Sequence, residues 1–276
     1  MLDQAMLIEV EGDDAGRILH NLTTNHVQLL NPGQALESFV TDVRGWVVAH
    51  GVVYRSTENR WWIVGQHPSP ANVAAHIDRY IIREKAQVQD KSPTFSISVE
   101  LPGTTSELQA EGLVRIPFDS FEPEASLNVL PKSTEVFQQD VRDWTQLRIA
   151  HFWPQMGRDI WEKCIPQELD RSEQAISFTK GCYLGQETIA RLDARGQIQK
   201  KLCLLKLDGS VAPADKLLFN DQEVGHITSV SNLPPVSLAL AVVRRGFFDI
   251  DTRLTCNGLA AQIIESASAL ALLSDE

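Results

Sequence analysis

The part of the sequence after Lys200 most constrains the fold, because short strand-like stretches follow one another there with turn residues between them. Gly, Asp, Asn and Pro separate these stretches, and chains of this texture close into small β-barrels or sandwiches. We predict strands at 202–207, 223–230, 237–243 and 260–265. The segment 200–276 is therefore expected to form a separate C-terminal β-barrel.

The sequence before Lys200 mixes helical and strand-like patterns. Apolar residues recur at helical spacing in three segments, 15–22, 69–81 and 136–152. Strand-like stretches at 46–54 and 61–64 are interpreted as a hairpin, and another strand is predicted at 95–101. The segment 102–131 is rich in Pro, Gly and Glu and is expected to be irregular. Together these patterns predict an α+β fold.

The net charge of −11 disfavours general binding to nucleic acid, since the protein as a whole repels polyanions. No apolar run is long enough to cross a membrane. The first ten residues include Asp3 and Glu9 and lack a basic leader, so no signal peptide is expected. These features predict a cytoplasmic protein without a membrane partner.

The cysteines and histidines do not show the spacing of a metal site. Their positions are Cys164, Cys182, Cys203 and Cys256, with no short CxxC pair. The seven histidines include no HExxH motif. We therefore expect free thiols in a reducing compartment and no metal held by the protein.

The most informative segment sets Cys182 between two glycines and beside a lysine. It reads Lys180-Gly181-Cys182-Tyr183-Leu184-Gly185-Gln186-Glu187. A helix is predicted from Gln186 onward, so Cys182 is expected just before a helix N-terminus, where the dipole and unpaired N–H groups favour a thiolate. Lys180 is expected to act in the same direction. Most cysteines are small buried hydrophobic residues, but these surroundings indicate a reactive thiol at Cys182.

This segment resembles the signature of the YgfZ-type folate-binding proteins of the aminomethyltransferase superfamily. The segment 19–25, Leu-His-Asn-Leu-Thr-Thr-Asn, resembles the N-terminal segment of that superfamily, and 223–229 resembles one of its barrel strands. The resemblance covers nearly the whole chain. The signature residues are Lys180, Gly181, Cys182, Tyr183, Gly185, Gln186 and Glu187.

The resemblance implies a ring of three domains around a channel that admits a tetrahydrofolate. The corresponding division is 1–20 plus 92–199 for the α+β domain with the Cys motif, 21–91 for an inserted α+β domain, and 200–276 for the barrel. It also implies a role in the assembly or repair of iron–sulfur proteins, including enzymes that modify tRNA. Iron–sulfur proteins are then the expected clients.

The chain departs from the glycine-cleavage aminomethyltransferases at the position of their acidic pair, where it has Ala49 and His50. Aminomethyl transfer needs a positioned carboxylate to manage the proton and the developing positive charge. An alanine cannot do this, so glycine-cleavage aminomethyltransferase activity is not expected. His50, on a strand among apolar residues, is interpreted as structural.

A second departure concerns folate. The relatives read Arg-x-Glu at the end of the helix before the signature, and the glutamate pairs with the pterin, whereas this chain has Arg148-Ile149-Ala150. Each unsatisfied pterin donor would cost about 1–3 kcal/mol, which weakens binding about tenfold to a hundredfold or more. Arg148 is a candidate contact to an anionic folate tail, or alternatively a surface ion pair with Asp143 or Asp159.

The segment from Lys180 to Lys201 is basic, with five basic residues and two acidic ones. Its basic residues are Lys180, Arg191, Arg195, Lys200 and Lys201. This patch could hold a folate tail, with Arg191 as a candidate contact, or a tRNA phosphate, although such runs are also common on solvated helices.

Three functions remain open from the sequence. The first is a folate-binding accessory protein for iron–sulfur clusters that uses a thiolate at Cys182. The second is a folate-dependent one-carbon transferase acting on a small amine. The third is a binding module without folate, which Ala150 favours.

Overall fold

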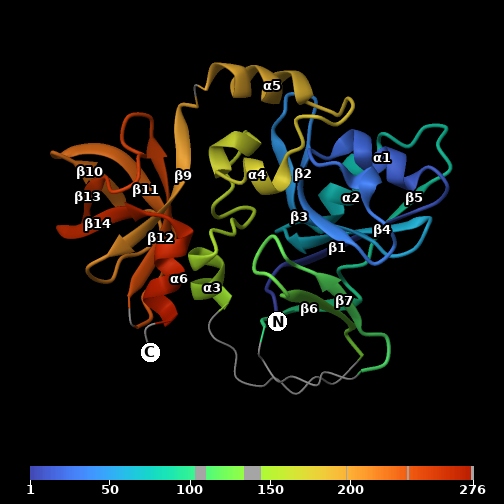
Figure 1. The fold of residues 1–276 in the computed structure, drawn as a ribbon, viewed down its shortest axis with the longest axis horizontal. Coiled ribbons are helices and arrows are strands. Elements are labelled where there is room, and N and C mark those ends of the chain that lie inside the picture. The colour runs from blue at the N-terminus through green and yellow to red at the C-terminus, as the bar shows by residue number, and fades with distance from the viewer. Residues whose placement is uncertain (103–109, 134–143, 197, 235, 275–276) are drawn as a thin grey trace. The chain divides into compact units, whose positions relative to one another are not determined.

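The computed structural model describes residues 1–276 except 103–109, 134–143, 197, 235 and 275–276 (Figure 1). The chain divides into two compact units. Unit 1 comprises Met1–Gln139 and Arg171–Ala190, and unit 2 comprises Asp140–Asp170 and Arg191–Glu276. Each unit is described separately below. The division into three domains stays a prediction.

Unit 1 is built on a five-stranded antiparallel sheet with the order β2-β3-β4-β1-β5. Its strands are β1 (Ala5–Glu11), β2 (Ala35–Thr41), β3 (Val47–Arg55), β4 (Arg60–Gln66) and β5 (Gln87–Asp90). The predicted hairpin is the β3–β4 pair, in which Val53 lies opposite Ile63. The N-terminal strand β1 pairs with β4 and β5 and therefore belongs to the same sheet.

Two helices, α1 (Ala15–Leu22) and α2 (Pro70–Asp78), cover one face of this sheet (Figure 1). Ile18 and Leu19 of α1 and Ile77 of α2 lie fully or almost fully buried in one apolar core with the sheet. Helix α2 ends at Asp78, three residues before the predicted end. Burial of these apolar stripes stabilises the packing of the helices on the sheet.

A second, three-stranded sheet completes unit 1 with the order β6-β8-β7. Its strands are β6 (Phe95–Glu100), β7 (Val114–Pro117) and β8 (Ser126–Pro131). The strand at 95–101 was predicted, but the expectation that 102–131 is irregular was wrong for β7 and β8. The Pro and Gly residues near these strands led to the wrong prediction. Strand β8 is nevertheless buried, with Leu127 and Val129 in the interior.

Unit 2 contains a closed six-stranded barrel, as the sequence predicted, with the order β10-β11-β12-β9-β14-β13. The strands are β9 (Lys200–Leu207), β10 (Lys216–Phe219), β11 (Gln222–Ser231), β12 (Ser237–Arg244), β13 (Arg253–Cys256) and β14 (Leu259–Ile264). The short strands β10 and β13 were not predicted, because four residues show too few alternations. They are needed to close the barrel, since β10 pairs with β13.

Two helices of unit 2 accompany the barrel, α3 (Trp144–Ala150) and α6 (Ser266–Ser274). The predicted helix at 136–152 corresponds to α3, and its first part, 136–143, lies outside the described residues. Helix α5 (Gln186–Arg195) begins in unit 1 and continues into unit 2. Among the described residues, no helix has the length and apolar character to cross a membrane.

Candidate functional site

In unit 1 the loop before helix α5 is held against the N-terminal segment that follows α1. The Lys180 ammonium donates hydrogen bonds to three main-chain carbonyl oxygens, those of His20 at 2.6 Å, Thr23 at 2.6 Å and Asn25 at 2.8 Å. An ammonium has three N–H donors, so all three are used. The sequence motif at 180–187 is thereby joined to the motif at 19–25.

Further bonds hold the same two segments together. The Leu184 N–H donates to the Asn21 carbonyl at 2.8 Å, and the Ser177 N–H donates to the Thr24 carbonyl at 3.0 Å. The Thr24 hydroxyl donates to the Ala175 carbonyl at 2.6 Å. Most of these bonds involve main-chain atoms, so the loop has a defined backbone path over the N-terminal segment.

Lys180 is 5% exposed and has no carboxylate partner among the described residues. Its ammonium also lies 4.9 Å from the centre of the Tyr183 ring. Burial lowers the pKa of Lys180 to about 7. Lys180, which the sequence grouped with the basic residues of 180–201, is therefore an internal part of the loop.

Cys182 is the exposed cysteine of the chain, and Cys164, Cys203 and Cys256 are buried. Burial raises the pKa of Cys203 to about 12 and also raises the pKa of the Cys164 and Cys256 thiols. All four are free thiols. Cys182 is therefore the cysteine that external reagents and partners reach most easily, whereas its thiolate character stays a prediction.

The two signature glycines have different surroundings. Gly185 has φ +79°, and a Cβ there would lie 2.5 Å from the Asp42 carbonyl oxygen and 2.5 Å from the Gly45 Cα. The loop thus packs backbone against backbone on the turn between β2 and β3, which only glycine permits. Gly181 is exposed, and a Cβ there would meet only the His20 Nε2 at 3.9 Å.

The remaining signature residues lie around this turn. The Tyr183 side chain is buried, and its N–H donates to the Gln186 side-chain oxygen at 3.4 Å. Glu187 is exposed in the first turn of α5. The Thr41 hydroxyl donates to the Leu184 carbonyl at 2.7 Å, which joins the loop to the end of β2.

His20 lies behind the Gly181 backbone and was not singled out by the sequence. It is 7% exposed, and its Nδ1 has no hydrogen-bond partner among the described residues. Its ring centroid lies 4.8 Å from that of His26. Burial, the Lys180 charge and His26 lower the pKa of His20 to about 4, so its imidazole is neutral at pH 7.

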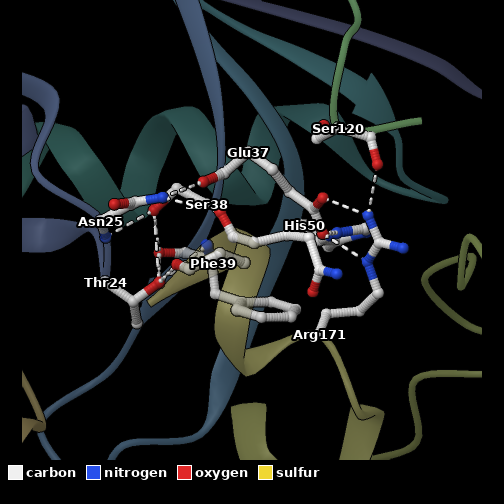
Figure 2. Close-up of polar contacts among 10 residues, drawn as sticks. Thr24, Asn25, Glu37, Ser38, Phe39, His50, Ser120 and Arg171 are labelled. Carbon is white, nitrogen blue, oxygen red and sulfur yellow. Dashed lines mark hydrogen bonds and ion pairs between the residues drawn. The ribbon is translucent and has the colours of Figure 1, made fainter. Parts of the chain in front are cut away.

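A second buried cluster in unit 1 joins Glu37 of β2, His50 of β3 and Arg171 (Figure 2). The Arg171 guanidinium binds both carboxylate oxygens of Glu37, with its Nε 2.8 Å from Oε1. It also donates to the Ser120 carbonyl at 2.9 Å. The His50 Nε2 lies 2.9 Å from the same Oε1 of Glu37. All three side chains are almost fully buried.

This cluster refines the sequence interpretation of His50. His50 is not isolated among apolar residues, since it is bonded to a carboxylate and its ring stacks on Phe39 with centroids 4.8 Å apart. Its structural role stays a prediction. Burial by itself would raise the pKa of Glu37, but Arg171 and the hydrogen bonds from Arg171 and His50 lower it overall. Glu37 is therefore an ionised carboxylate already occupied by a guanidinium, and is unsuited to accept a proton from a substrate.

Arg148, the predicted folate contact, lies in unit 2 and is 1% exposed. Its guanidinium binds Asp159 at 2.7 Å and the Ser229 hydroxyl of β11 at 2.7 Å. Arg148 does pair with Asp159, but this ion pair is buried and not on the surface. The other proposed partner, Asp143, lies outside the described residues. Ala150 is fully buried, and its carbonyl accepts the Ser266 hydroxyl at 2.5 Å.

The predicted basic patch at 180–201 is largely occupied by internal contacts. Within unit 2, Lys200 lies 4.3 Å from the Trp161 ring centre, and Lys201 forms an ion pair with Asp170 at 2.8 Å. Arg191 is exposed on α5, and the Arg195 side chain lies outside those described. The contacts of Arg148 and Arg191 with a cofactor stay predictions.

The chain is similar in sequence to known proteins. The family model of the GCVT N-terminal domain matches residues 2–116. An uncharacterized protein of Haemophilus influenzae is 30% identical over 280 residues, covering 95% of this chain and 94% of that protein. The tRNA-modifying protein YgfZ of Escherichia coli O157:H7 is 24% identical over 237 residues, covering 77% of this chain and 72% of that protein.

The fold also has a solved counterpart. The crystal structure of glycine cleavage system aminomethyltransferase T from Bartonella henselae matches with a TM-score of 0.78 at 16% identity, covering 95% of this chain and 83% of that one. The predicted α+β fold with a C-terminal barrel is thereby confirmed. The chain belongs to the GCVT N-terminal domain family and is distantly related to YgfZ.

Replacement of Gly185 by alanine is expected to destabilise the signature loop. The positive φ and the close approach to Asp42 and Gly45 together cost about 2–4 kcal/mol. Gly181→Ala is the matched control, since a Cβ there makes only an ordinary van der Waals contact with the His20 Nε2 at 3.9 Å. It should change stability by less than about 0.5 kcal/mol. Urea unfolding followed by fluorescence measures both; equal effects would contradict the backbone packing described here.

Replacement of Glu37 by glutamine is expected to lower the free energy of unfolding by about 3–5 kcal/mol, because the buried Arg171 loses its counter-charge. Glu58→Gln, which removes the exposed partner of Arg55, serves as control and should cost about 1 kcal/mol or less. Thermal unfolding compares the two variants with the native chain. A loss no larger than that of the control would show that the Glu37 cluster is not an ion pair in solution.

Proposed function

We propose that the protein is a folate-binding accessory protein that supports iron–sulfur proteins, and through them tRNA modification, by means of the Cys182 thiol. The observation that carries this proposal is the presentation of one exposed thiol on a loop held by three hydrogen bonds from Lys180. A thiol fixed in this way keeps a constant orientation toward a partner, which lowers the entropic cost of reaction.

The relatives support the cellular role. The similar Escherichia coli protein carries the name tRNA-modifying protein YgfZ, and the signature Lys180 to Glu187 resembles that type of protein. The exposed Cys182 provides a nucleophile or a ligand for such a role. The clients proposed here are iron–sulfur proteins, and the proposed compartment is the reducing cytoplasm.

Aminomethyl transfer is a weaker candidate because of the site at Ala49 and His50. The carboxylate that contacts His50, that of Glu37, is also bound by Arg171. A base in this arrangement would have to break a buried ion pair before it could act, at a cost of several kcal/mol. The likeness to the aminomethyltransferase of Bartonella henselae supports the fold, and we do not propose this chemistry for the chain.

Folate remains the proposed ligand. Because position 150 is an alanine, we propose that other polar groups bind the pterin in place of a glutamate. In unit 2, the Gln155 side chain is 2% exposed and its Nε2 has no partner among the described residues. The Ser231 hydroxyl is likewise buried and unpartnered. Buried polar groups without partners commonly pair with water or a ligand, so these groups are our candidates to bind the pterin. Reduced folate would supply the one-carbon chemistry or a redox-active ring.

A binding module without folate is the second candidate, and Ala150 is the observation that favours it. The two candidates differ in whether a reduced folate binds at all. Under the second candidate, Cys182 alone would carry the function, and Gln155 and Ser231 would have no folate to bind.

We expect the native chain to bind tetrahydrofolate and its 5-formyl form in a calorimetric titration. Gln155→Leu should weaken binding about tenfold or more through the loss of a hydrogen bond. Gln199→Leu, at an exposed position, is the control and should bind as the native chain does. Absence of binding by the native chain, with recovery in Ala150→Glu, would instead support the module without folate.

The Cys182→Ser variant should fail to restore iron–sulfur enzyme activity and tRNA modification in a strain that lacks its own protein of this family. Cys203→Ser, which changes a buried thiol, is the control and should restore both. Protein levels and melting temperatures must be compared, because a buried substitution can lower stability. Full restoration by Cys182→Ser would contradict a role for the thiol.

A further inference from the structure

The loop that carries Cys182 exposes a run of peptide N–H groups without acceptors. From Phe178 to Cys182, no peptide N–H has a hydrogen-bond acceptor within the described part of the chain. The groups on either side do have one, since the Ser177 N–H binds the Thr24 carbonyl and the Tyr183 N–H binds Gln186. Peptide N–H groups without an acceptor in the protein are available as hydrogen-bond donors to a bound anion.

A positive charge lies within the same loop and is not neutralised by a carboxylate. The Lys180 ammonium is buried against three carbonyl oxygens, which are neutral. Among the described residues it has no acidic partner. Buried charges in proteins are normally paired. When Lys180 is protonated, below its pKa of about 7, its unpaired charge makes the electrostatic potential of the loop positive.

His20 supplies a side chain that faces the loop. It is more than nine-tenths buried, and its Nδ1 is unpartnered. Its Nε2 is the atom nearest to the open side of Gly181, 3.9 Å from the position of a Cβ there. The imidazole is thus available for a hydrogen bond to a group bound at the Gly181–Cys182 turn. This observation is independent of the free N–H groups and of the lysine.

We propose that the loop from Phe178 to Cys182 is a binding site for a small oxyanion, the carboxylate or phosphate group of a ligand. The peptide N–H groups and His20 would donate hydrogen bonds to the oxyanion. The charge of the buried Lys180 would stabilise it electrostatically. This inference deepens the proposed function, on which it rests for the role of Cys182. It places the anionic group of the partner molecule beside the thiol.

His20 provides a direct reporter of such binding. The titratable groups that act on it are Lys180 and His26, and neither is acidic. Burial and the Lys180 charge hold the pKa of His20 at about 4. A bound anion adds the missing opposite charge and should raise this pKa by about 1–3 units. The imidazole signals of His20 in NMR titrations measure this shift.

The test uses inorganic phosphate and acetate, with sodium chloride at equal ionic strength as reference. Phosphate, which stays anionic at pH 4, should raise the pKa of His20. At pH 7, where acetate is also ionised, phosphate, acetate or both should slow alkylation of Cys182 by iodoacetamide, a neutral reagent. Lys180→Met should abolish these effects. Lys85→Met, which removes an exposed lysine of the same unit, should retain them. The difference between phosphate and acetate identifies which group the site prefers.

Two outcomes would overturn the site. Either chloride acts as strongly as phosphate and acetate, or the anion effects persist undiminished in Lys180→Met. If that variant does not fold, His20→Asn replaces it, and unchanged protection of Cys182 in His20→Asn would likewise contradict the site. The assay uses neither folate nor a client protein, so its failure is distinguishable from failure of the proposed function.

Discussion

The bonding of the Lys180 ammonium by three main-chain carbonyls is the interaction on which the candidate site depends. It connects two segments that are 155 to 160 residues apart in the sequence. Removal of an ammonium from water costs several kcal/mol, and each hydrogen bond to a charged group returns about 1.5–3 kcal/mol. The loop can therefore keep this lysine inside only if all three carbonyls are in place. That requirement specifies the path of the segment 19–26 as well as that of the loop.

The segment from Arg171 to Gly185 is held by a buried cation near each end, and the two are compensated differently. Arg171 is neutralised by the ionised carboxylate of Glu37 (Figure 2), whereas Lys180 meets only neutral carbonyls. The first arrangement provides stability without a net charge. The second leaves an uncompensated positive charge in the loop that carries Cys182 when Lys180 is protonated. Burial, followed by this charge, keeps the neighbouring His20 neutral. The proposed oxyanion site therefore lies at the Lys180 end of the segment.

Unit 2 also contains a buried arginine, Arg148, that joins separate elements. Arg148 joins α3 to the barrel strand β11 through Asp159 and Ser229, and the Thr228 hydroxyl donates to the same Asp159 at 2.6 Å. With Arg148 engaged in this way, polar groups without partners become the more suitable candidates for ligand contacts. Gln155 and Ser231 meet that criterion. Ala150 offers no polar side chain to a ligand, but the side chains of Gln155 and Ser231 do.

The sequence by itself determined the elements with strong periodicity, and it indicated the Cys182 segment as the candidate site. The barrel strands, the β3–β4 hairpin and α1 follow from alternation or helical spacing, which are local properties of the chain. Short elements such as β10 and β13, and the strands β7 and β8 among Pro and Gly, are too brief to show a period. Glu37 and Arg171 are 134 residues apart, and no local pattern reveals that they share one buried site. Whether Lys180 lies in solvent or inside, and which groups compensate its charge, was decided only by the tertiary structure, because burial and ion pairing depend on residues distant in sequence.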